Sequence, residues 1–181
     1  MLTIVNVKKI LADSLIELSY SKSIDKITVQ NIVEHCHTGR QTFYNHFSDK
    51  YELINWIYKE KAEKVLNVFN ENKNWYECMR LTYMVFWENR QFFTRVANLT
   101  GHNYFVDFFY DHTRSYYINS IVSRFGKDEI SDSLLYSIEF DSIGEVHMCL
   151  KWIKEGMKES PETMAKRNVE NIPPNLMKYF I

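Results

Sequence analysis

Apolar residues recur every three or four positions along nearly the whole chain, and this spacing constrains the fold more than any other feature. Near the N-terminus it predicts a helix over about residues 4–20, with one face formed by Ile4, Val7, Leu11, Leu15 and Leu18. The 181 residues include only five Gly and three Pro, too few for a fold that needs many tight turns. The sequence therefore predicts an all-α fold.

Capping residues and helix breakers divide the rest of the chain into helices. Thr28 is a good N-cap for a two-turn apolar stripe that ends at Cys36, and Gly39 gives the following connection the freedom of a tight turn. The next helix is expected over about 40–47, and Ser48 is expected to cap a long helix over about 49–71. Later helices are expected at about 74–88, 90–99, 103–125 and 131–158, with Gly126 and Ser131 at their ends, and Ser160-Pro161 opens a last helix that Pro173-Pro174 ends or kinks.

Aromatic residues are distributed unequally along the chain. Fourteen of the 28 lie between Trp75 and Tyr117, whereas the first 42 residues contain only Tyr20. This shift predicts a small N-terminal domain, residues 1–47, and a larger aromatic-rich helical body, residues 48–181, which begins with the long helix from about residue 49.

Charge and composition narrow the class of protein. Residues 1–64 hold nine Lys and Arg against eight Asp and Glu, so the chain lacks the strongly basic character that often marks a nucleic-acid-binding protein. No apolar run approaches the roughly 20 residues that span a bilayer, and Lys8 and Lys9 stand where a signal peptide would need its apolar centre. The three Cys are scattered, which argues against a disulfide framework. We therefore expect a cytoplasmic protein that does not enter a membrane.

One segment, GRQTFYNHFSDKYEL at residues 39–53, departs from the pattern of a plain amphipathic helix. Phe43 and Phe47 lie four residues apart, share one helical face and are expected in the core. The other sides carry long or planar hydrogen-bonding groups, namely Arg40, Gln41, Tyr44 and Asn45. Two short helices joined by a three-residue turn and packed on a longer helix form a helix-turn-helix, whose second helix enters the major groove of DNA.

This arrangement predicts a role for each polar side chain near the second helix. Arg can pair with guanine, and Gln with adenine, through two hydrogen bonds each. The base-reading residues are predicted to be Gly39, Arg40, Gln41 and Asn45. The phosphate contacts, which fix register without reading sequence, are predicted from Thr28, Thr42, Tyr44, His46 and Lys50. The alternative for the same residues is a solvated helix face.

The segment ITVQNIVEHCHTGRQTFYNHFSDKYELI resembles the TetR-type transcriptional regulators, whose DNA-binding segment typically reads like ITVxxIAxxAGVSxGTFYxHFxxKxEL. The matching residues are Ile27, Thr28, Val29, Ile32, Thr42, Phe43, Tyr44, His46, Phe47, Lys50, Glu52 and Leu53. The family's turn Gly and the small residues after it are replaced by His37, Thr38 and Gly39, and Gln41 stands where the family has a Gly. These departures lie in the turn and at the reading edge, so the base preference does not carry over. The run RQTFYN followed by ELINWIY is further similar to the branch that includes regulators of dihydroxyacetone kinase operons.

The resemblance, which covers about residues 5–60, implies a homodimer that binds a palindromic operator in double-stranded DNA. It also implies that the last two long helices pair with those of a second subunit, and the segment 131–158 offers Leu134, Ile138, Ile143, Val146, Leu150 and Ile153 for that contact. An unknown small-molecule effector or a coregulator protein would control the affinity for DNA. Repression is the commoner sign in the family, and the dihydroxyacetone-kinase-like branch leaves activation through a protein coactivator open.

The aromatic residues of the body have two interpretations. Either they pack as ordinary core, or some of them line an effector pocket, because ligand sites combine apolar walls with a few polar anchors. The residues predicted for such a pocket are Tyr83, Trp87, Phe93, Phe105, Phe108, His112 and Tyr116.

We expect no metal, no cofactor and no enzymatic activity. His147 and Cys149 lie two residues apart and point to nearly opposite sides of a helix, so they cannot easily share one ion. The sequence contains none of the common nucleophile, phosphate-loop or zinc-protease motifs, and Glu139 and Asp141 are interpreted as helix-surface charges. The alternative to a DNA-binding regulator is a helical protein-interaction module with no DNA role.

Overall fold

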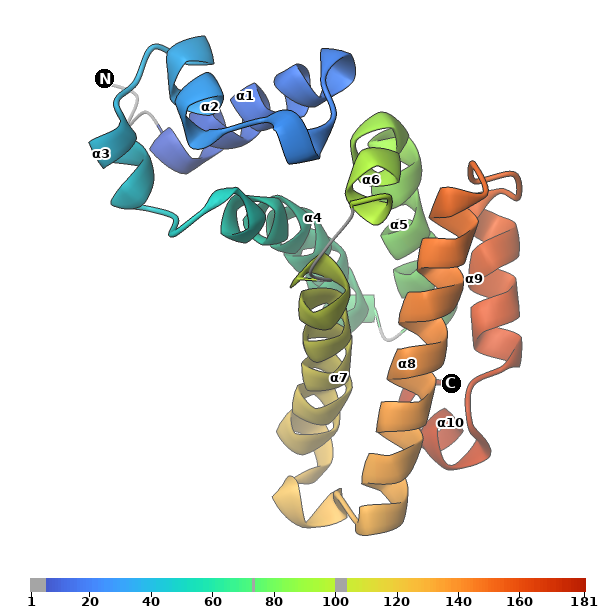
Figure 1. Ribbon diagram of the computed structural model, residues 1–181. Helices are drawn as coiled ribbons and strands as arrows, with labels where there is room; N and C mark the ends of the chain where they lie inside the picture. Colours follow the sequence, from blue (N-terminus) through green and yellow to red (C-terminus); the bar gives the residue numbers. More distant parts are fainter. Residues whose placement is uncertain (1–5, 73, 100–103) are drawn as a thin grey trace.

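The computed structural model describes residues 6–72, 74–99 and 104–181, and the described residues form helices without any strand (Figure 1). The all-α prediction is confirmed. The elements are α1 (Val7–Ser21), η1 (Ile24–Lys26), α2 (Val29–His35), α3 (Arg40–Tyr44), α4 (Lys50–Asn72), α5 (Trp75–Glu88), α6 (Arg90–Ala97), α7 (Tyr104–Phe125), η2 (Lys127–Glu129), α8 (Asp132–Lys154), α9 (Pro161–Glu170) and α10 (Pro174–Phe180). Ile4, which was predicted to begin the first helical face, and residue 103, the expected start of a later helix, lie outside the described residues.

The caps of most helices agree with the prediction, and one does not. Thr28 caps α2, while Ser131 and Ser160 cap α8 and α9 through their side-chain oxygens. The predicted cap of α4, Ser48, is wrong by one residue. Asp49 Oδ1 instead accepts the backbone N–H groups of Tyr51 and Glu52, both at 2.8 Å.

The C-terminal end of the chain contains a helix that the sequence did not predict. The segment after Ser160 ends at Glu170, three residues before the proline pair, and Pro174 begins the separate helix α10. Proline is well tolerated at the first helical position because it has no N–H group to leave unpaired. Phe180 of α10 is buried, with its ring centroid 4.7 Å from that of Trp75 and 5.0 Å from that of Tyr117. The last helix therefore completes the core.

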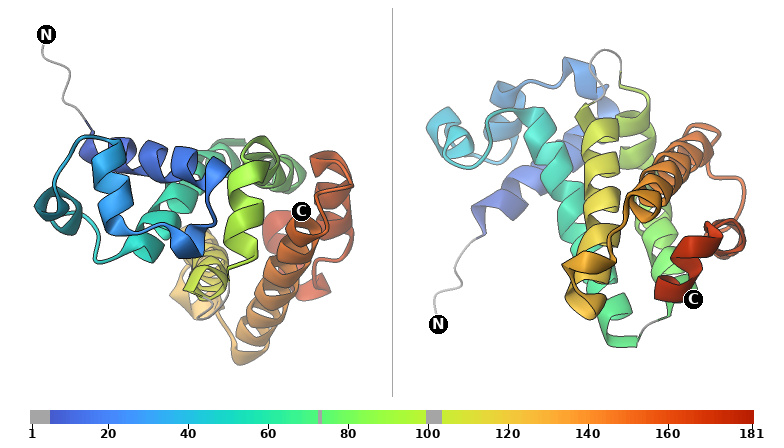
Figure 2. Two further views of the ribbon diagram at one scale, coloured as in Figure 1. Left: turned by 45° about the horizontal axis from the view of Figure 1, so that its top comes forward. Right: turned by 90° about the horizontal axis from the view of Figure 1, so that it is seen from below.

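The helices form a small N-terminal group and a larger body, with α4 running from one into the other (Figures 1 and 2). Within the body α9 packs on α5, and α7 packs on α8. At the junction, α6 lies against the end of α1, where Arg95 Nη2 donates to the carbonyl oxygen of Tyr20 at 3.1 Å. One continuous hydrophobic core extends from Leu11 to Phe180. None of the helices among the described residues combines the length and the apolar character that a membrane span needs.

Helix α8 buries one face and exposes another. Five of the six apolar residues that the sequence offered for a dimer contact lie at most 5% exposed in the chain's own core: Leu134, Ile138, Val146, Leu150 and Ile153. The sixth, Ile143, is 50% exposed. The helical spacing identified an apolar face correctly, but most of that face packs inside the same chain.

Candidate DNA-binding surface

Two aromatic side chains fix helix α3 to the rest of the N-terminal group. Phe43 and Phe47 are almost fully buried, as predicted, and their ring centroids lie 5.9 Å apart. Phe47 also meets Trp56 of α4 at 5.9 Å, and Lys8 of α1 lies over its ring at 5.5 Å. With one side held in this way, Arg40, Gln41 and Tyr44 are left exposed on the other sides of α3.

The turn between α2 and α3 is tightly specified by backbone hydrogen bonds. Thr38 N donates to Val33 O at 2.8 Å and His37 N donates to Glu34 O at 3.2 Å, the paired bonds of a Schellman motif. His37 adopts a φ of 53° at the position of this motif that favours glycine. The residue that replaces the family's turn Gly thus takes a conformation that usually requires Gly.

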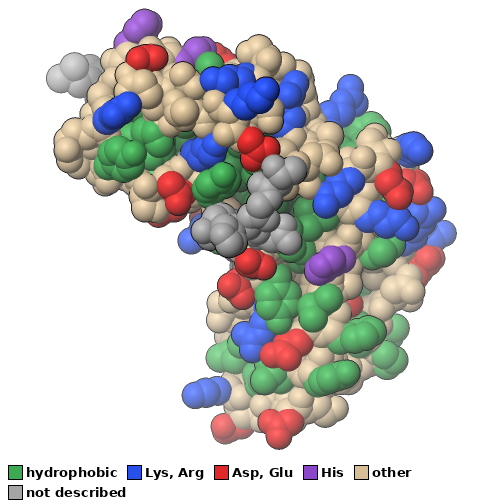
Figure 3. All heavy atoms as spheres, viewed as in Figure 1, with side chains coloured by type: hydrophobic (Ala, Val, Ile, Leu, Met, Phe, Trp, Pro, Cys, Tyr) green, Lys and Arg blue, Asp and Glu red, His purple; other side chains and the backbone are tan. Residues whose placement is uncertain are grey.

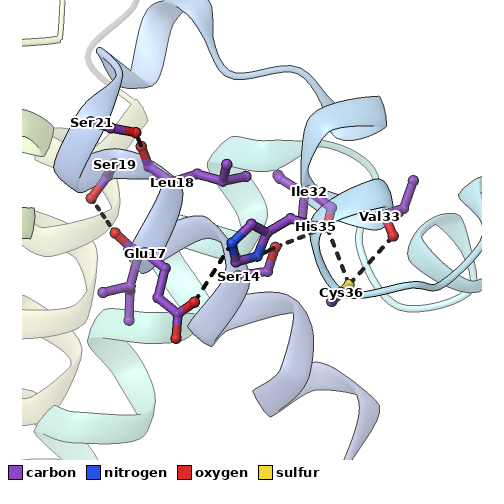
Figure 4. A network of polar contacts seen from close by, with 10 residues as sticks. Ser14, Glu17, Leu18, Ser19, Ser21, Ile32, Val33, His35 and Cys36 are labelled. Carbon is purple, nitrogen blue, oxygen red and sulfur yellow. Dashed lines mark hydrogen bonds and ion pairs between the residues drawn. The ribbon is translucent and has the colours of Figure 1, made fainter.

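A polar network joins α1 to α2 (Figure 4). Ser14 donates its hydroxyl hydrogen to the carbonyl oxygen of Ile32 at 2.8 Å, so Ser14 Oγ is left to accept from His35 Nδ1 at 3.1 Å. The other ring nitrogen of His35 lies 3.6 Å from a carboxylate oxygen of Glu17. These contacts tie α2 to the longer helix α1.

Lys50, at the first position of α4, is bonded to η1. Its Nζ donates to the carbonyl oxygens of Ile24 at 2.8 Å, Asp25 at 3.0 Å and Ile27 at 2.8 Å. Burial lowers the pKa of Lys50, and the carboxylates of Asp25 and Asp49 oppose this shift. An ammonium group has three hydrogens, so the phosphate contact predicted for Lys50 would require one of these bonds to be released.

The exposed face of α3 carries the predicted base-reading residues. Gly39, Arg40, Gln41 and Asn45 are all exposed, and Tyr44 beside them is 54% exposed. Gln41 Nε2 donates to Asn45 Oδ1 at 3.0 Å. Arg40 Nε donates to Gln30 on α2, which in turn donates to Glu34. Gln30 was missed by the sequence prediction, although it lies one helical turn before Glu34 on the outward side of α2.

The remaining predicted phosphate contacts surround this face. Thr28 is exposed and its hydroxyl oxygen accepts the backbone N–H of Asn31 at 3.2 Å, whereas Thr42 and His46 are half-buried. Tyr44 packs edge-on against Phe43 with 5.5 Å between the ring centroids, which leaves its hydroxyl end free to extend outward. The four residues thus lie at the start of α2, on α3 and just after α3, beside Arg40 and Gln41.

The seven residues predicted for an effector pocket do not surround a single cavity. Phe93 and Phe105 are buried in the core, Trp87 stacks on Trp152, and Phe108 stacks on His112. His112 and Tyr116 line a cavity of only about 20 Å³, enough for one water molecule. Tyr83 faces a larger cavity on the other side of α5. For most of this aromatic belt, packing is the role seen here.

The interpretation of Glu139 and Asp141 as surface charges is half right. Glu139 forms an ion pair with Arg114 at 3.2 Å, and both side chains are partly exposed. Asp141 Oδ2 instead accepts the hydroxyl of the buried Tyr117 at 2.8 Å, and burial raises the pKa of this carboxyl group. Neighbouring positions on α8 therefore have different environments.

An all-α chain whose first three helices form a helix-turn-helix with an exposed polar second helix defines a DNA-binding regulator. Comparison with protein families agrees with this class. Residues 12–57 match the family described as bacterial regulatory proteins, tetR family, and residues 73–172 match the transcriptional regulator C-terminal region. The chain belongs to the TetR family of transcriptional regulators, and its relatives are regulators rather than enzymes.

Individual relatives place the chain near one branch of the family. The HTH-type dhaKLM operon transcriptional activator DhaS of Lactococcus lactis subsp. lactis (strain IL1403) is 28% identical over 89 residues, 49% of this chain, and the chain spans only 48% of that relative's length. The solved structure of a dihydroxyacetone kinase operon activator DhaS has a TM-score of 0.69 at 20% identity, with 98% of this chain and 99% of that chain covered. A TetR transcriptional regulator from Streptococcus agalactiae 2603V has a TM-score of 0.61 at 18% identity, over 97% of this chain and 94% of that chain. These structures share the fold.

Proposed function

We propose that this regulator acts in the cytoplasm as a homodimer that binds a palindromic operator through α3, with its DNA affinity controlled by a small-molecule effector or a partner protein. The observation that carries the proposal is the exposed polar face of α3, held in place by the buried Phe43 and Phe47. A helical module that only binds proteins has no need for such a face. We also propose that the DNA-binding domain ends near residue 47, where the C-terminal domain begins.

Side-chain chemistry assigns different roles in DNA binding to the residues on this face. Arg40 and Gln41 lie at the start of α3, which is the part of a recognition helix that approaches base edges. On binding DNA, Arg40 would exchange its bond to Gln30 for two bonds to a guanine. Thr28, Thr42, Tyr44 and His46 would contact phosphates, and Lys50 would support them by holding η1.

The dimer contact is proposed on the exposed side of α8. Four large apolar residues of α8 are exposed and follow one another at spacings of three to five residues. They are Tyr136 (71% exposed), Phe140 (67%), Ile143 (50%) and Met148 (55%). Figure 3 shows hydrophobic side chains over the part of the surface where α7 and α8 lie. A row of apolar side chains on one helix marks a contact surface rather than scattered exposure. We call these four residues the α8 row.

The sign of regulation is open to two proposals. The relative named DhaS is a transcriptional activator of an operon. The aromatic belt packs as core around a cavity of only about 20 Å³, which has no room for a small effector. A small effector would then need another site in the body.

The first test is binding of the purified protein to its own upstream DNA and to a scrambled duplex, across a series of salt concentrations. Sequence-dependent binding with a steep salt slope is expected, because each phosphate contact releases counterions. Arg40→Ala should cost about 1–3 kcal/mol and relax the preference at one base position, whereas Tyr44→Ala should weaken binding to all duplexes. Lys59→Ala, which removes an exposed cation paired with Glu63 on α4, is the control. No binding even at low salt would favour the interaction-module alternative.

A further inference from the structure

The body contains a cavity that the sequence did not predict, between α5, α8 and α9. Its volume of about 450 Å³ falls within the range of small-molecule sites. The residues around it are Tyr83, Phe140, Asp141, Gly144, Glu145, Met148, Met164, Arg167, Asn168 and Asn171. Glu145 lines both this cavity and the small one beside His112 and Tyr116, and the two cavities share no other lining residue.

The walls of the cavity combine flexible and aromatic apolar groups. Met148 and Met164 offer unbranched side chains that adapt to different shapes, and Phe140 and Tyr83 offer flat ring surfaces. Such walls suit an apolar body of moderate size. They do not by themselves choose the chemical class of a ligand.

Two carboxyl groups define the polar side of the cavity, and they share too few hydrogen-bond donors. Tyr117 has a single hydroxyl hydrogen, yet its oxygen lies 2.8 Å from Asp141 Oδ2 and 3.2 Å from Glu145 Oε2. Asn168 provides a further hydrogen bond to Glu145. Glu145 is only 9% exposed, so its carboxyl group lies at the inner side of the cavity.

No basic side chain in the described parts of the chain pairs with either carboxyl group. Arg167 lines the cavity, but its Nη1 bonds to Glu159 at 3.1 Å. Arg114 on α7 pairs with Glu139 instead. Burial and the neighbouring Asp141 raise the pKa of Glu145 to about 8. At neutral pH the cavity without a ligand therefore holds a proton on Glu145, and a bound cation with N–H donors would take its place by pairing with both acids.

We propose that this cavity binds an organic cation, a protonated amine with an apolar body, whose ammonium group bonds to Asp141 and Glu145 while its body packs on Phe140 and Met148. A role for this cation as the effector rests on the function proposed above. Phe140 and Met148 also belong to the α8 row, so a bound ligand would lie directly against the proposed dimer contact.

Three compounds that share one carbon skeleton and differ in their head group test the chemistry of the site: 4-phenylbutylamine, 4-phenylbutanol and 4-phenylbutyrate. Each is titrated into the full chain by calorimetry, with thermal unfolding as a second readout. We expect saturable binding of the amine, and at least tenfold weaker binding of the alcohol and the carboxylate. Equal affinity for the amine and the alcohol would overturn the proposal.

Two variants test the site from opposite sides. Glu145→Gln keeps the shape of the side chain and removes its charge, and should weaken amine binding at least tenfold. Gly144→Leu adds a side chain at the cavity wall and leaves both acids in the sequence, and a Cβ at Gly144 meets no atom within 4 Å. It keeps the proposal testable if Glu145→Gln fails to fold. Glu139→Gln, the same change at a carboxylate paired outside the cavity, should leave amine binding unchanged.

The outcomes separate this site from the proposed function. Unchanged amine affinity in both Glu145→Gln and Gly144→Leu would overturn the site, even if operator binding is normal. Binding of none of the three compounds, together with loss of dimer in Gly144→Leu, would also overturn it, in favour of a side chain from a second copy as the occupant. Amine binding that leaves operator affinity unchanged would support the site and contradict its role as effector site.

Discussion

His37 stores backbone strain at the centre of the helix-turn-helix. Its φ of 53° lies in the left-handed region, which costs a non-glycine residue roughly 1–2 kcal/mol. His37→Gly should therefore raise the free energy of unfolding by about 1 kcal/mol, measured by urea denaturation. Thr38→Gly, one residue later and without a positive φ, is the control and should lower stability because it adds freedom to the unfolded chain. A loss of stability in His37→Gly would mean that the imidazole makes a compensating contact.

Lys50 offers a direct choice between a structural and a phosphate-binding role. Lys50→Met removes the donor shared by three carbonyl oxygens and should cost about 2 kcal/mol of unfolding free energy. The exposed Lys26 in η1 provides the control, since Lys26→Met should change stability by less than about 0.5 kcal/mol. Unchanged stability of Lys50→Met, with a DNA salt slope reduced by about one, would support the phosphate role instead.

Among the elements, α10 is expected to contribute more to the free energy of unfolding than its seven residues suggest. Phe180 lies against Trp75 and Tyr117, which belong to α5 and α7. Phe180→Ala should cost about 3 kcal/mol, the lower end of the range for buried Phe, because a terminal helix can relax around the space left behind. Met177→Ala on the exposed side of the same helix should have a much smaller effect. Similar unfolding midpoints for the two variants would show that α10 docks only loosely.

The elements also show what sequence reasoning can resolve. Long amphipathic helices such as α7 and α8 were predicted to within a few residues, because several turns of spacing support each of them. Helix α10 has only seven residues and begins at Pro174, and the proline pair was interpreted as the end or kink of the preceding helix. Ser48 and Asp49 are both good caps, and only the backbone geometry decides between them. The sequence did not predict that Asp141 and Glu145 line a cavity. The residues of α9 that complete this cavity leave no mark on the sequence of α8.

For the whole molecule, the α8 row predicts how the proposed dimer would be held together. Phe140→Glu would place a charge in an apolar contact and should raise the dimer dissociation constant at least a hundredfold, about 2.7 kcal/mol. Sedimentation equilibrium measures this constant directly. Tyr20→Glu changes an exposed aromatic on α1, 47% exposed, and should leave it unchanged. A dimer that survives Phe140→Glu would place the contact on another face.

Helix α4 connects the N-terminal group of helices to the body. Its 23 residues, at a rise of about 1.5 Å each, give a rod about 35 Å long. One end begins at Lys50, bonded to η1 beside the DNA-facing helices, while the other end lies in the body. A tilt of only about 5° would displace the far end by about 3 Å, close to the 3.4 Å between successive base pairs of DNA. A repacking too small to change the fold would therefore be large enough to shift α3 by about one base-pair step along the DNA.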